Sequence, residues 1–71
     1  MTLIKVIEIM ASSEKGWEDA TNAAVKIAAK TVKGIRSVYI KHMSAMVKEN
    51  KITEYRVNVK ISFEVLSDLQ S

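Results

Sequence analysis

With 71 residues, the chain is long enough for one domain, spanning residues 1–71, and too short for two. A domain this small buries only about 60% of the surface of its unfolded chain, so small domains often add disulfides, a structural metal or partner subunits. There is no cysteine and His42 is the only histidine, which excludes disulfides and argues against an ordinary zinc site. Self-association remains, beside the simpler alternative that the thin core suffices.

The charge pattern narrows the possible partners. The formal net charge is +3, and eight acidic residues are scattered among eleven basic ones without a long basic run. This pattern favours solvated surface charge over nucleic-acid binding. The first ten residues include Lys5 and Glu8 and are too short and too charged for a signal peptide or a membrane span. Since the absence of cysteine also fits a reducing compartment, we expect a cytoplasmic protein without a membrane partner.

Residues 3–10 predict the first strand, because LIKVIEIM is rich in isoleucine and valine and is followed by polar residues. Apolar residues occur on both faces of this strand, which is typical of strands that are covered on both sides. If the helix covers one face, the outer face needs another partner. The first strand therefore favours self-association.

Residues 17–33 predict a helix that Gly16 or Ser13 can begin and Gly34 can end. Apolar residues recur along it at helical spacing and form one stripe, in which alanine is frequent. Such a stripe allows a helix to lie close to a sheet. We interpret Trp17, at the start, as a packing residue. The stripe consists of Trp17, Ala20, Ala24, Ile27, Ala28 and Val32.

Residues 35–48 and 52–65 predict two long strands joined by a short turn at Glu49-Asn50, and residues 66–71 are expected to form a loose tail. The last strand alternates between apolar and polar residues, so one face is buried. Counting back from the turn assigns Ile40–Val59 and Val38–Ile61 to the helix-covered face. The other face then pairs Ser37 with Ser62, Tyr39 with Lys60, Met43 with Arg56, and Val47 with Ile52.

On this count Tyr39, Met43, Val47 and Ile52 lie together on the uncovered face. Apolar side chains gathered on an exposed face are typical of contact surfaces. We therefore predict that these four residues belong to an assembly surface between identical copies.

Two strings in this chain resemble the dodecins. KVIEIMASSEKGWEDATNAAVKIAAKTVKGIR is similar to the opening of that family, and ITEYRVNVKISFEV is similar to its last strand. The resemblance covers about nine-tenths of the chain. It implies an α+β fold of β-α-β-β order, a three-stranded antiparallel sheet wrapped around one helix, and a hollow shell of twelve copies. Many dodecins bind flavin in pairs and store it, without catalysis. The matching residues are Lys5, Val6, Glu8, Ile9, Trp17, Glu18, Ala20, Thr31, Ile35, Arg36, Tyr55, Phe63, Glu64 and Val65.

The resemblance also locates the family's flavin site. In flavin-binding dodecins a tryptophan after the helix stacks on the isoalloxazine ring, and a glutamine after the tyrosine of the last strand hydrogen-bonds the flavin. Here Ser37 stands in place of the tryptophan and Arg56 in place of the glutamine. Serine has no π surface, and each stacked pair is worth about 0.5–1.5 kcal/mol beyond burial. Arg56 adds a positive charge, which suits a phosphate or carboxylate better than a neutral ring.

A subset of dodecins lacks the tryptophan, carries this arginine and binds calcium, and this sequence is similar to that subset. The resemblance assigns no calcium ligands to named positions. In the predicted register Ser37 and Arg56 lie on the same face about 20 Å apart. If both line one pocket, we expect that pocket to lie between subunits.

Two functions stay open: a shell that sequesters a small molecule or ion, with flavin the less favoured ligand, and an assembly with vestigial pockets and a structural role or calcium-linked stability. An enzyme is disfavoured, because nucleophilic catalysis needs a positioned pair such as Ser-His or Cys-His, and His42 is the only imidazole. We expect His42 on the core side of the second strand or at its edge. No glycine-rich phosphate loop occurs in the sequence.

Overall fold

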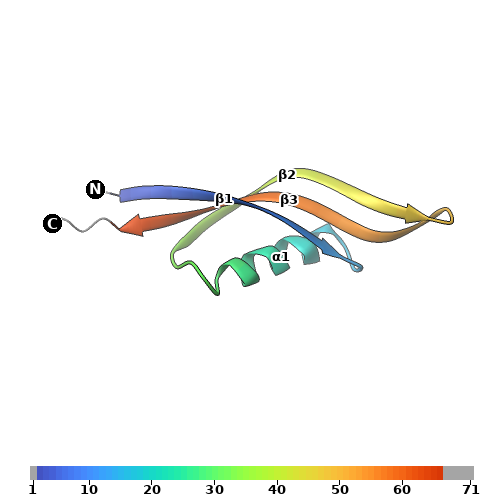
Figure 1. The fold of residues 1–71 in the computed structure, drawn as a ribbon, viewed down its shortest axis with the longest axis horizontal. Coiled ribbons are helices and arrows are strands. Elements are labelled where there is room, and N and C mark those ends of the chain that lie inside the picture. The colour runs from blue at the N-terminus through green and yellow to red at the C-terminus, as the bar shows by residue number, and fades with distance from the viewer. Residues whose placement is uncertain (1, 67–71) are drawn as a thin grey trace.

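The computed structural model describes residues 2–66, in the order β1 (Thr2–Ser13), α1 (Trp17–Ala28), β2 (Ile35–Lys48) and β3 (Lys51–Leu66). The strands form one antiparallel sheet in the order β1-β3-β2, and α1 lies against one of its faces (Figure 1). The predicted β-α-β-β order and sheet are confirmed. Leu66 belongs to β3 rather than to a tail, and residues 67–71 lie outside the described residues.

The core is a single layer of side chains between α1 and the central strand β3. Val57, Val59 and Ile61 are almost fully buried, which confirms the predicted alternation of β3. The helix packs on them through its alanines, whose short side chains let the helix approach the sheet closely. Ile27 was expected in this stripe but is 62% exposed, because the helix is turned so that Thr21 faces the sheet. The buried helix residues are Ala20, Thr21, Ala24 and Ala28.

The helix ends at Ala28, five residues earlier than predicted. The residues that follow form a tighter turn, in which the Lys30 and Thr31 amides donate to carbonyls three residues back at 3.1 and 3.0 Å. Gly34 therefore does not end the helix. Its φ of 75° instead leads the chain into β2, where its carbonyl accepts a hydrogen bond from the Glu64 amide at 3.0 Å.

The turn between β2 and β3 is confirmed at Glu49-Asn50, where both residues have positive φ, as a type I′ hairpin turn requires. The predicted cross-strand pairs are confirmed with one exception. Counted from the turn, the register first shifts between Met46 and Val47, where Thr53 of β3 is left unpaired. It returns to the predicted count between Ile40 and His42, where Lys41 is an extra residue in β2.

The stretch between these two shifts corrects two expectations. Met43 pairs with Val57 rather than with Arg56, so it lies on the helix side of the sheet and not beside Tyr39. His42 pairs with Asn58 and lies on the face turned away from the helix, not on the core side.

The subunit is long and thin, with principal extents of 58 × 19 × 13 Å. Its radius of gyration is 15.1 Å, whereas about 11 Å is typical of a globular chain of this length. The β2–β3 hairpin extends beyond the helix (Figure 1). Much of the sheet therefore has no cover from its own chain.

Close helix packing predicts a sharp difference between two alanines. Ala24 is 1% exposed against the sheet, whereas Ala29, just after the helix, is exposed. Ala24→Leu should lower the free energy of unfolding by about 1–3 kcal/mol, because the added volume forces the helix away from the sheet. Ala29→Leu should change it by less than about 0.5 kcal/mol. Guanidinium unfolding at one protein concentration measures both, and equal effects would contradict the packing.

Candidate functional site

Both candidate ligand residues lie on the face of the sheet turned away from α1, which we call the open face. The open face consists of the even-numbered residues of β1 and β3, residues 4–12 and 54–64, together with Ser37, Tyr39, His42, Ser44 and Met46 of β2.

Ser37 and Arg56 lie far apart on this face. The Ser37 hydroxyl hydrogen-bonds the hydroxyl of its cross-strand partner Ser62 at 2.5 Å. Arg56 lies six residues along β3 from Ser62, about 20 Å away. Its Nε donates to Glu54 Oε1 at 3.1 Å. One subunit therefore does not bring the two residues together, and a pocket lined by both stays a prediction that needs a second copy.

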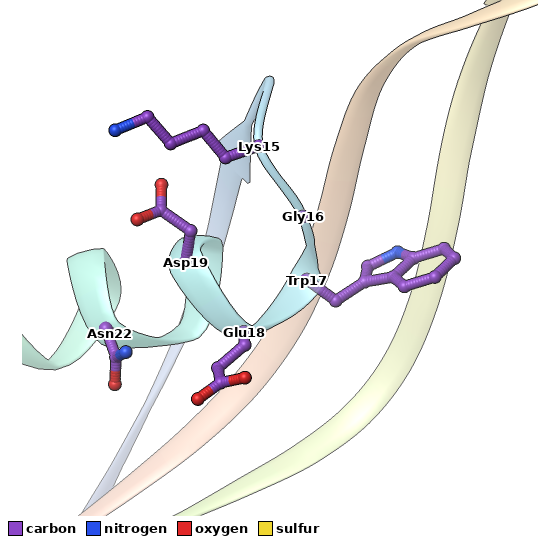
Figure 2. A pocket seen from close by; sticks show the side chains of 6 residues that line it. All are labelled: Lys15, Gly16, Trp17, Glu18, Asp19 and Asn22. Carbon is purple, nitrogen blue, oxygen red and sulfur yellow. The ribbon is translucent and has the colours of Figure 1, made fainter.

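Trp17 serves packing, as predicted, and offers no substitute stacking surface at Ser37. Its indole Nε1 donates to the Ser44 carbonyl at 2.9 Å, and its ring meets Tyr55 edge-on with a centroid separation of 4.9 Å. Figure 2 shows Trp17 pointing toward the strands, while Lys15 and Asp19 point the other way. The indole thus connects the start of the helix to β2 at Ser44.

The predicted assembly residues are all exposed in the single subunit, although they do not form one patch. Tyr39 is on the open face, Met43 is on the helix side, and Val47 pairs with Ile52 near the hairpin turn. The exposed fractions are 65% for Tyr39, 53% for Met43, 64% for Val47 and 51% for Ile52. Strand β1 adds three apolar residues to the open face, Ile4, Val6 and Met10.

Ion pairs cross the open face between strands. Arg36 of β2 bonds Glu64 of β3, and Lys41 reaches over β3 to Glu8 of β1, with a distance of 3.3 Å between Nζ and Oε2. Exposed pairs of this kind contribute about 0–1 kcal/mol each. They matter more for the local charge, since each neutralises one carboxylate of the face.

Sequence reasoning did not single out Asn58 and Lys60, which lie with Arg56 on the open face of the central strand. The alternation of β3 carried the signal, because residues 56, 58, 60 and 62 are all polar donors. The sequence did not predict which residues of β2 lie beside them, because the register shifts in the β2–β3 pairing determine those neighbours.

Within residues 2–66 no three histidine, cysteine or acidic side chains come close enough together to hold a metal ion. Across the same residues, the structure contains no helix with the length and apolarity to span a membrane.

A shallow hollow of about 450 Å³ lies at the start of α1 (Figure 2). Lys15, Asp19 and Asn22 are among its lining residues. Asp19 accepts a hydrogen bond from Ser13 at 2.6 Å, and the Ser13 hydroxyl accepts one from the Lys15 amide at 2.9 Å. These contacts order the residues that lead into the helix, and Asp19 is already engaged by Ser13.

A single helix on one face of a three-stranded antiparallel sheet, with the other face left open, defines a small β-α-β-β protein. The family model for Dodecin matches residues 3–66, so the chain belongs to the dodecin family. No curated protein sequence matches the chain.

Solved structures agree with this assignment. A variant of the Thermus thermophilus dodecin is 27% identical with a TM-score of 0.88, and the match covers 94% of this chain and 100% of that one. The calcium dodecin of Mycobacterium tuberculosis, described as a calcium-chelating antigen with a novel calcium-binding site, is 31% identical with a TM-score of 0.78, with 97% of each chain covered. The Streptomyces coelicolor dodecin shares the fold at 18% identity, with a TM-score of 0.88, covering 94% of this chain and 96% of that one.

The packing role of Trp17 leads to a prediction. Trp17→Phe keeps an aromatic ring against Tyr55 but removes the hydrogen bond to Ser44, so it should lower the free energy of unfolding by about 0.5–1.5 kcal/mol. Circular dichroism during guanidinium unfolding measures this. Particle mass and ligand binding should stay as in the unsubstituted protein, and loss of ligand binding at unchanged stability would show that Trp17 is a ligand residue instead.

Proposed function

We propose that this chain is a non-enzymatic dodecin in which identical copies, twelve in a hollow shell, bind a small molecule or ion in pockets between subunits. Residues 1–71 would act as a single domain, in the cytoplasm, as the absence of cysteine suggests. The observation that carries the proposal is the open face, on which apolar residues of β1 and β2 are more than half exposed in a single subunit.

Association between copies is favoured by the apolar surface that the residues of the open face and the hairpin end leave exposed to water. Fully burying a large apolar side chain stabilises by about 1.5–3 kcal/mol. Val6, Met10 and Tyr39 on the open face, and Val47 and Ile52 near the hairpin turn, are each more than half exposed. A second copy packed on them would supply the burial that a domain of this length lacks.

The ligand of such pockets would differ from the flavin of many relatives. Ser37 offers a hydroxyl already bonded to Ser62 rather than an aromatic ring, and Arg56 offers a charge rather than an amide. Calcium is an alternative, favoured by the likeness to the calcium dodecin of Mycobacterium tuberculosis. Its ligands would then come from more than one subunit, or the pockets would be vestigial and the role structural.

The first test of this proposal restores the missing flavin groups. Ser37→Trp combined with Arg56→Gln should create flavin binding, since each replaced side chain regains the stacking or amide group of flavin-binding relatives. Quenching of riboflavin fluorescence measures it, with the unsubstituted protein expected to quench little. Strong quenching by the unsubstituted protein would show that flavin binds without either group.

The second test concerns assembly. Tyr39→Glu places a charge on the open face, where it costs the isolated subunit little because Tyr39 is 65% exposed, but a buried interface much more. Native mass spectrometry should show a large particle for the unsubstituted protein and smaller species for the variant. Lys30→Glu, a charge change in the exposed turn that follows the helix, is the control. A monomer from the unsubstituted protein would overturn the shell, and calcium-dependent melting of the same sample tests the alternative ligand.

A further inference from the structure

We propose that the ligand of this protein is a small oxyanion, a phosphate or carboxylate compound, held on the open face of the central strand by Arg56, Asn58 and Lys60 with His42 beside them. This deepens the proposed ligand binding at Arg56 and rests on it. The argument starts from the register of the sheet, which places these side chains next to one another on one face.

The three β3 residues form a line of hydrogen-bond donors. Arg56, Asn58 and Lys60 follow one another on the same face at intervals of about 7 Å. The cross-strand neighbours on β2 are Ser44 for Arg56 and His42 for Asn58. Both long cationic side chains can therefore lean toward a group held above Asn58.

The donors in this line are largely free to bind a ligand. Glu54 occupies only Nε of Arg56, at 3.1 Å, and leaves the two terminal guanidinium nitrogens without a partner within residues 2–66. In the same part of the chain, no side-chain hydrogen bond or ion pair involves Asn58, Lys60 or His42. Glu54 thus holds one edge of the guanidinium and leaves its two terminal nitrogens, which can bind an oxyanion in a bidentate manner.

The charge of the face points the same way. Its carboxylates are Glu8, Glu54 and Glu64, and each already has a cation within ion-pair distance. Lys60 lies opposite Glu8 of β1 and is the cation without an ion pair among the described residues of this face. An anion would balance this charge, whereas a divalent metal ion or a neutral ring would not.

Isothermal titration calorimetry of the intact protein with inorganic pyrophosphate and, separately, with citrate tests the inference at fixed ionic strength. At least one anion should bind, and the two arms distinguish phosphate from carboxylate ligands. Lys60→Met should weaken that binding about tenfold or more, the loss of one charge-assisted hydrogen bond, and Arg56→Gln should weaken it by as much or more.

Lys26→Met is the matched control, because Lys26 is an exposed lysine on α1, away from the open face. Binding that Lys26→Met weakens as much as Lys60→Met would reveal general attraction to a basic protein and overturn the site, as would heat from neither anion. Light scattering on the same samples separates the two proposals. An assembled particle that binds neither anion contradicts only the oxyanion, whereas anion binding by a monomer contradicts only the shell.

Discussion

The packing of three alanines of α1 on the central strand is the constraint on which the rest of the subunit depends. Ala20, Ala24 and Ala28 bring the helix close enough to bury the core residues of β3. A helix of 12 residues is about 18 Å long, whereas a strand of 16 residues spans about 50 Å. The helix can therefore cover only part of one face, and the hairpin end and the whole open face must be covered by other copies or stay in water.

Two register shifts, at Thr53 of β3 and at Lys41 of β2, decide what β2 presents on the open face between them. Because side chains alternate along a strand, one extra residue exchanges the faces of all that follow until the next irregularity. Met43 thereby moves to the helix side, while His42 and Ser44 move to the open face. On the resulting face, apolar and polar residues lie opposite each other, since Met10 of β1 pairs with Asn58 and Tyr39 of β2 pairs with Lys60. A copy packed on Met10 and Tyr39 would therefore border the proposed ligand site on β3.

The sequence predicted the features that rest on local chemistry or on a simple period. The alternation of β3 identified the buried residues, and Glu49-Asn50 identified the turn and the pairs on either side of it. It did not predict the bulge, because no residue type marks Lys41 as unpaired. The predicted helix end was also wrong. Glycine is a residue type that often ends helices, but Gly34 instead lets the backbone lie close to the backbone of Glu64. The positions of Ser37 and Arg56 followed correctly, because the two register shifts cancel before Ser37 and its partner Ser62 lies on the same face of β3 as Arg56.

The replacement of the stacking tryptophan and of the amide act together on the choice of ligand. A neutral ring placed on the open face near Arg56 would cover the guanidinium and Lys60. It would remove water from both cations without offering a negative charge in its place. Ser37, already bonded to Ser62, would add no stacking to offset that cost. An oxyanion also displaces water, but it replaces each lost hydration contact with a charge-assisted hydrogen bond. At the site proposed here, ligand preference would therefore be set by desolvation, since positive charge on the central strand penalises a neutral ring and stabilises an anion.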